Sequence, residues 1–180
     1  MKAFQDERQH GLPSSPEQFR TLAIRHLNRI YCVRSHMSER LQDLIGQSDF
    51  AGLQVALVET QLSVEQQLAR LYGIYLLMDS VPAMTGCDEL TELMESDYAT
   101  IYGQFAGPVF RDLAVLFYLQ TAESAAMISF RLLRLLAAQM GNERLQGLLA
   151  EICDGVVAYP LLFSAITEKH GDAYFGNQDI

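Results

Sequence analysis

The sequence predicts an all-α protein whose long amphipathic helices pack into a bundle. Apolar residues recur at spacings of three and four over long stretches, which is the periodicity of a helix with one buried face. Helix-capping and helix-breaking residues separate these stretches, and no alternation of apolar and polar residues indicates a strand. With 180 residues, of which 49% are hydrophobic, the chain is long enough for one domain with its own core.

The first two predicted helices form a pair. The first covers residues 16–46, with a serine cap before Pro16 and Gly46 at its end. The second begins at the Ser-Asp cap of residues 48–49 and continues to residue 79. The turn between them is so short that the two helices must lie antiparallel. Their inward positions are Phe19, Ala23, Leu27, Ile30, Met37, Leu41 and Leu44 on the first, and Phe50, Leu53, Leu57, Val64, Leu71, Ile74 and Met78 on the second.

Three further helices complete the predicted fold. A break around Pro82 precedes a short helix at 88–103. The third long helix, 108–140, is apolar on nearly all sides, and such a helix is buried either in the centre of a bundle or beneath a partner subunit. We therefore expect a homo-oligomer, with a dimer favoured. The last long helix covers 143–169, and Pro160 inside it is expected to kink or interrupt it.

The domain organisation follows from these elements. Residues 1–14 are predicted to form a flexible N-terminal arm, 15–170 the helical bundle and 171–180 a polar C-terminal tail. The N-terminus lacks the apolar segment of a signal peptide, and no uninterrupted apolar stretch approaches the ~18–20 residues of a membrane span. We therefore expect a soluble, cytoplasmic protein with no membrane partner.

Charge and cysteine content exclude further classes. The formal net charge is −9, and so acidic a surface repels phosphate backbones, so no nucleic-acid partner is expected. Cys32, Cys87 and Cys153 are far apart and odd in number, and they show no metal-ligand spacing. This pattern predicts reduced, mostly buried thiols rather than a disulfide framework or a zinc site.

Three short segments carry a family resemblance. They are residues 27–37 (LNRIYCVRSHM), Glu59-Thr60 with Val64-Glu65, and residues 134–141 (RLLAAQMG). With the order of the helices, they make the chain similar to the YciE/YciF-type ferritin-like family of bacterial stress proteins over nearly its whole length. The resemblance implies a ferritin-like antiparallel four-helix bundle with a short extra helix in the crossover, and a stress-related role.

The resemblance also draws attention to metal ligands, because ferritin-like enzymes hold two metal ions with glutamates and Glu-x-x-His pairs on facing helices. Where the family tends to carry an acidic ligand on the first helix, this chain has Arg34. Glu59, Glu123 and Asp154 remain on the other long helices, without a histidine beside them. These three are the remaining candidates for a metal site, and no cofactor is expected.

Arg34 lies on the apolar stripe of its helix with Leu27 and Leu41, and Glu123 lies on the inner stripe of the third long helix. A lone buried guanidinium costs several kcal/mol, so a buried Arg34 must be paired. One interpretation is a buried ion pair between Arg34 and Glu123, with the permanent positive charge standing where relatives hold a metal. The alternative is that the helix rolls and Arg34 reaches the solvent.

We therefore interpret the sequence as a non-catalytic ferritin-like bundle with a structural or interaction role. The first alternative is a di-iron or di-manganese oxidoreductase that uses Glu59, Glu123 and Asp154 as an atypical ligand set. The second is a bundle that binds a small apolar molecule in a pocket lined by Met and Phe. The sequence contains no glycine-rich phosphate loop and no nucleophile motif that would indicate another enzyme class.

Overall fold

The computed structural model describes residues 15–48, 51–103, 107–156 and 168. Within these ranges the chain forms helices and no strand, which confirms the all-α prediction. The predicted N-terminal arm, C-terminal tail and kink at Pro160 lie outside the described residues. The helices are α1 (Pro16–Leu44), α2 (Ala51–Leu77), α3 (Asp88–Ile101), α4 (Pro108–Gln139) and α5 (Glu143–Val156).

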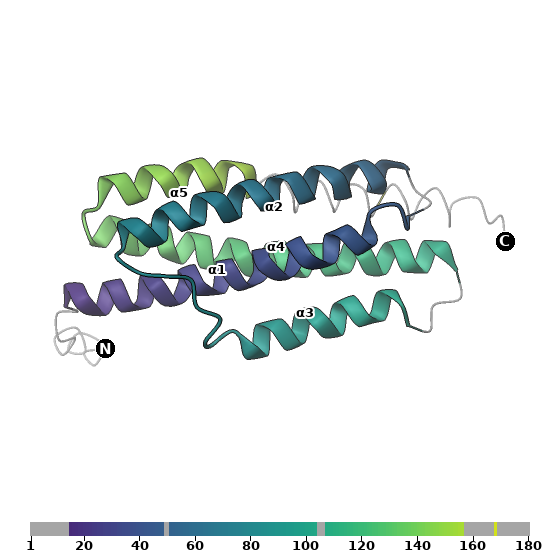
Figure 1. The fold of residues 1–180 in the computed structure, drawn as a ribbon, viewed down its shortest axis with the longest axis horizontal. Coiled ribbons are helices and arrows are strands. Elements are labelled where there is room, and N and C mark those ends of the chain that lie inside the picture. The colour runs from purple at the N-terminus through teal and green to yellow at the C-terminus, as the bar shows by residue number, and fades with distance from the viewer. Residues whose placement is uncertain (1–14, 49–50, 104–106, 157–167, 169–180) are drawn as a thin grey trace, which may run out of the picture.

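Four of these helices make an antiparallel bundle, as predicted (Figure 1). Helix α1 packs against α2 and α4, and α5 packs against the same two helices from the opposite side. The short helix α3 belongs to the crossover between α2 and α4, and it packs outside the bundle on α1 and α4. Helix α4 therefore contacts three other helices, which explains why so little of its surface is polar.

Local sequence signals fix the ends of the helices. Ser15 and Gln18 form a capping box at the start of α1: the Ser15 hydroxyl accepts from the backbone N–H of Gln18, and the Ser15 N–H donates to the Gln18 side chain. Just after α1, Gly46 has a φ of 87°, and after α4 Gly141 has a φ of 63°. Both positions need the left-handed conformation that glycine adopts without strain, so the chain can reverse sharply there.

The predicted inward positions form one continuous core. Of the inward positions predicted for the first two helices, Phe50 lies outside the described residues, and all the others except the partly buried Phe19 are buried. Leu27, Met37 and Leu57 are fully inaccessible, and each such side chain stabilises the fold by about 1.5–3 kcal/mol relative to exposure. Burial of this stripe fixes the roll of α1 about its axis. The same roll carries Arg34 into the interior.

Two of the three cysteines are joined, so the prediction of reduced thiols is wrong for them. Cys32 of α1 and Cys87, directly before α3, form a disulfide, with Cα atoms 6.5 Å apart and both residues 2% exposed. The two cysteines are 55 residues apart, so no local pattern in the sequence indicates their pairing. Only the crossover brings them together. The side chain of Cys153 lies outside the described part.

Helix α4 is long and apolar enough, from Phe110 to Gln139, to cross a bilayer by length and composition alone. Half of its most apolar stretch is buried inside the bundle, and core helices of soluble proteins pass the same test, so this is weak evidence for a membrane span. The sequence shows no uninterrupted apolar stretch in this region because charged residues such as Glu123 and Arg131 interrupt the helix.

Candidate functional site

The centre of the bundle contains a charged pair. Arg34 of α1 and Glu123 of α4 are both 0% exposed. The two terminal guanidinium nitrogens of Arg34 donate to the two carboxylate oxygens of Glu123, at 2.6 Å to Oε1 and 2.8 Å to Oε2. This is the parallel two-bond geometry in which an arginine and a carboxylate match best. The guanidinium does not reach solvent, in contrast to the alternative in which α1 rolls outward.

Arg34 makes few hydrogen bonds beyond those to Glu123. Nη1 of Arg34 also lies 3.2 Å from the sulfur of Met37, a weak acceptor one turn further along α1. Nε of Arg34 has no hydrogen-bond partner among the described residues. A buried pair of this kind contributes little net stability, but removing one partner leaves an uncompensated charge in the core. The pair therefore makes Arg34 and Glu123 depend strongly on each other.

The other metal candidates do not join this pair. Glu59 is exposed on α2, whereas Glu123 is fully buried. Asp154 lies in α5, but its side chain is outside the described part. No group of three His, Cys, Asp or Glu side chains that could hold a metal ion occurs among the residues with described positions. Both oxygens of the Glu123 carboxylate are bound by a permanent cation, and the other buried carboxylate in the described part, Asp112, belongs to no such group. The described residues therefore do not fit a ferritin-type metal pair.

A second polar cluster links α1, α3 and α4 around the buried His36. Its Nδ1 lies 3.0 Å from the Tyr118 hydroxyl of α4, and its Nε2 lies 3.2 Å from Oε1 of Glu95 on α3. Arg40, one turn after His36, donates to the same carboxylate oxygen at 2.5 Å and stacks over the Tyr98 ring at 5.0 Å. This cluster attaches the short helix α3 to the bundle.

Electrostatics in this cluster favour a neutral histidine. Burial lowers the pKa of His36 below its ordinary 6.5, and this outweighs the opposite pull of the Glu95 carboxylate. The hydrogen bond from Arg40 lowers the pKa of Glu95, so that carboxylate stays ionised and paired with the arginine. Burial raises the pKa of Tyr118, which keeps its hydroxyl protonated. The sequence gives no sign of this cluster, because the partners of His36 come from other helices.

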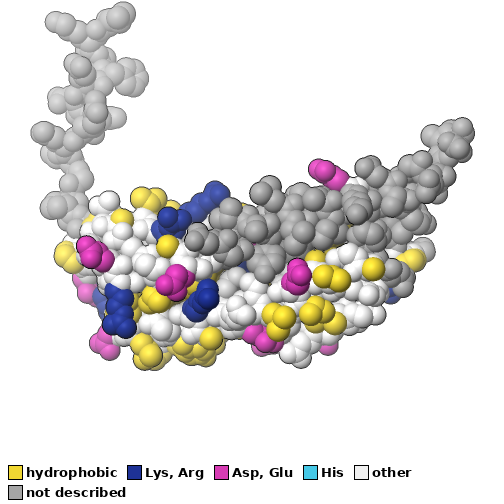
Figure 2. All heavy atoms as spheres, turned by 90° about the horizontal axis from the view of Figure 1, so that it is seen from above, with side chains coloured by type: hydrophobic (Ala, Val, Ile, Leu, Met, Phe, Trp, Pro, Cys, Tyr) yellow, Lys and Arg dark blue, Asp and Glu magenta, His cyan; other side chains and the backbone are white. Residues whose placement is uncertain are grey.

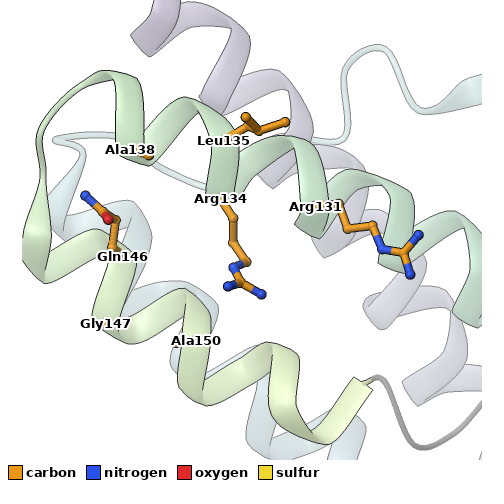
Figure 3. A pocket seen from close by; sticks show the side chains of 7 residues that line it. All are labelled: Arg131, Arg134, Leu135, Ala138, Gln146, Gly147 and Ala150. Carbon is orange, nitrogen blue, oxygen red and sulfur yellow. The ribbon is translucent and has the colours of Figure 1, made fainter.

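A groove of about 640 Å³ opens between the second half of α4 and α5 (Figure 3). Arg131, Arg134, Leu135 and Ala138 of α4 line one side, and Gln146, Gly147 and Ala150 of α5 line the other. The lining is a mixture of guanidinium groups and small side chains, so the groove differs from the Met- and Phe-lined pocket expected for an apolar ligand. No sequence signal pointed to it, because it depends on how two helices pack.

Fold and site together define a ferritin-like four-helix bundle with a charged pair, rather than a ligand cluster, at its described centre. The chain belongs to the family described as a domain of unknown function, DUF892, whose model matches residues 18–169. This confirms the resemblance to YciE/YciF-type ferritin-like proteins.

A solved structure supports the fold. The protein is similar to "YcfI, a putative structural protein from Rhodopseudomonas palustris", with a TM-score of 0.73. The match covers 88% of this chain and 96% of that one at 18% identity, so it supports the fold and not a function. No curated protein matches this sequence significantly.

Proposed function

We propose that this protein is a non-catalytic ferritin-like bundle with a structural or interaction role. The observation that carries the proposal is the Arg34–Glu123 pair, because it occupies both oxygens of Glu123, the candidate metal ligand that the structure places inside the bundle. Arginine cannot lose its proton in a protein, so its charge repels a divalent cation from this part of the core. On this proposal the guanidinium does structurally what a metal ion does in ferritin-like enzymes: it joins two helices.

The biological setting is proposed from the resemblance. The description of YcfI as a structural protein is in keeping with a non-catalytic role, and we propose a stress-related function in the cytoplasm. The Cys32–Cys87 disulfide is the observation that opposes a cytoplasmic location, because disulfides persist mainly in oxidising compartments. Trapping thiols in intact cells, followed by mass spectrometry, tests the location: a fully oxidised pair in growing cells would argue for another compartment.

We further propose that the protein acts as a homo-oligomer, with a dimer favoured. The apolar character of α4 motivated this expectation, and α4 leaves Phe117 and Ile128 about 58% and 60% exposed. Helix α2 offers a more regular stripe on the side away from the core, whose successive members are three, four, ten and four residues apart. Its large apolar members are Val55, Val58, Leu62, Tyr72 and Leu76, and their exposure runs from 43% to 81%. Pairing of this stripe with that of a second copy would remove it from water.

Light scattering after size-exclusion chromatography tests the dimer. At micromolar concentration and about 500 mM salt, which screens contacts between exposed charges, the wild type should have the mass of a dimer. Leu62→Glu/Leu76→Glu should be monomeric there because it places two charges on the stripe. Thr21→Glu/Gln42→Glu, at two exposed positions of α1, adds the same charge away from the stripe and should remain dimeric. A wild-type monomer would contradict this part of the proposal.

Metal analysis tests the non-catalytic role against the di-metal alternative. Protein purified without a chelator should contain less than about one equivalent of iron, manganese or zinc, whereas a ferritin-like centre would hold about two. If metal is found, Glu59→Ala and Asp154→Asn should leave its content unchanged under our proposal. A content near two equivalents that falls in these variants would establish the iron or manganese oxidoreductase instead.

A further inference from the structure

The groove between α4 and α5 has an unusual charge for so acidic a protein. Arg131 and Arg134 stand three residues apart on α4, so they share a face, and both line the groove (Figure 3). Neither arginine makes an ion pair or hydrogen bond with another described residue, and none of the lining side chains that the structure describes is acidic. The chain carries 22 acidic and 13 basic residues, so carboxylate partners are abundant elsewhere on its surface.

The opposite wall of the groove leaves room for a helix. Gly147 and Ala150 of α5 lie across it from Arg134, which points toward α5 in Figure 3, and Ala138 of α4 adds a third small residue. A Cβ atom placed on Gly147 would meet nothing within 4 Å. Leu135, which is 62% exposed, supplies an apolar surface beside the charges. An open groove of this kind suits an amphipathic helix whose exposed face carries acidic groups beside an apolar residue.

The helix α3 has such a face. Glu89 and Glu92 are exposed and form no ion pair with another described residue, and Leu93 beside them is 50% exposed. Glu92 and Leu93 lie three and four residues after Glu89. In the same way, Arg134 and Leu135 lie three and four residues after Arg131 on α4. Two short helical patterns therefore match in spacing and are opposite in charge.

We propose that α3 of a second copy docks in the α4–α5 groove, with Glu89 and Glu92 facing Arg131 and Arg134. This deepens, and rests on, the proposed role as a structural homo-oligomer. Within one molecule the contact cannot form, because α3 packs on α1 and α4 on the side of the bundle away from α5 (Figure 1). The two surfaces are different, so the contact is head-to-tail, and repetition gives rings or filaments rather than a closed pair. It leaves the exposed stripe of α2 free for the proposed dimer.

The assembly depends on charge, and a charge swap tests it. Arg131→Glu/Arg134→Glu makes the groove acidic, and Glu89→Arg/Glu92→Arg makes α3 basic, so each variant opposes like charges at the contact. Wild-type protein should grow beyond the dimer with rising concentration at about 50 mM salt and return to the dimer at about 500 mM. Each double variant should stop at the dimer in both salts, as measured by sedimentation velocity.

The decisive step is to mix the two variants. The acidic groove of one then meets the basic α3 of the other, so the 1:1 mixture should assemble again to the wild-type extent. Arg25→Glu/Arg29→Glu changes the charge by the same amount on α1 and serves as the control, with wild-type assembly expected. Circular dichroism of each variant verifies that it is folded.

Three results would overturn the proposal: a wild type that never exceeds the dimer at low salt, reversal variants that assemble like the wild type, or a mixture that does not recover. In each case a persistent dimer would leave the proposed function standing. Inorganic phosphate that binds the wild type but not Arg131→Glu/Arg134→Glu, without self-association, would reassign the groove to a small anion.

Discussion

Arg34 and Glu123 are separated by 89 positions in the chain, yet their side chains meet through two parallel hydrogen bonds in a part of the bundle that water does not reach. The pair joins α1 to α4, which also pack against each other along their apolar faces. Because both partners are fully buried, each is tolerable only with the other. The first two predictions follow from this dependence.

Removal of one partner of the Arg34–Glu123 pair should strongly destabilise the protein. Glu123→Ala leaves the Arg34 guanidinium buried without a counter-charge, and we expect the free energy of unfolding to fall by about 3–5 kcal/mol. Chemical denaturation followed by circular dichroism measures the change. Glu59→Ala, at an exposed carboxylate on α2, is the matched control and should change the stability by less than about 0.5 kcal/mol. A loss below about 1 kcal/mol for Glu123→Ala would be typical of an exposed pair.

Removal of both partners should be milder than removal of either one. Arg34→Met/Glu123→Met replaces the pair by apolar side chains that fill similar space, and such exchanges are often neutral or stabilising in other proteins. We expect the double variant to be more stable than Arg34→Met or Glu123→Met alone. The four proteins form a double-mutant cycle, whose coupling energy should exceed about 2 kcal/mol. Additive effects would show that the two residues do not act as a pair.

The free energy of unfolding should decrease as the pH is lowered below about 6.5, because of His36. Burial lowers its pKa in the folded protein, so on acidification the unfolded chain takes up a proton that the folded protein does not. The stabilising effect of the neutral ring is therefore complete above the unfolded pKa of 6.5 and is lost progressively below it. Thermal melts between pH 7.5 and 5.5 should show the decline, and His36→Gln should flatten it.

His26 is the internal comparison for that experiment, since burial lowers its pKa too. His26→Gln should remove a separate part of the pH dependence and leave the part due to His36. Glu95 adds a further loss only below about pH 4.5, because its pKa is lowered by the hydrogen bond from Arg40. A melting temperature that is unchanged from pH 7.5 to 5.5 would mean that His36 stays in contact with water.

The disulfide should contribute measurably to stability. Cys32 and Cys87 are 55 positions apart in the chain, and a cross-link of that span destabilises the unfolded chain by about 4 kcal/mol in the loop-entropy treatment. Cys32→Ser/Cys87→Ser should therefore unfold at lower denaturant, and reductant should destabilise the wild type by a similar amount. Reductant should leave the double variant unchanged. Equal stability of reduced and oxidised wild type would contradict the prediction.

The helices and the buried pair were predictable from the sequence for the same reason. Capping residues such as Ser15 mark where helices begin, and the three-four spacing of apolar residues fixes which side of each helix faces inward. Arg34 and Glu123 share those inward sides, so their positions follow from the helical period. The helix ends differ from the predicted ones by only one to a few residues in the described part.

The features that the sequence did not reveal depend on contacts between helices. Cys32 and Cys87 meet only because the crossover turns back along α1, and no local spacing encodes that turn. His36 gains Tyr118 and Glu95 from two other helices in the same way. The α4–α5 groove and the exposed stripe of α2 depend on which helix sides lack a neighbour. Periodicity distinguishes inside from outside but does not say which outer sides remain uncovered.

A metal titration tests most directly the proposal that the buried Arg34–Glu123 pair takes the place of a metal centre in the bundle. Melting temperatures of the wild type with and without excess Mn²⁺ or Fe²⁺ report any metal that binds the folded state, because such binding raises the melting temperature. We predict no shift, in the wild type or in Glu123→Ala. A rise of several degrees in the wild type that disappears in Glu123→Ala would contradict the account.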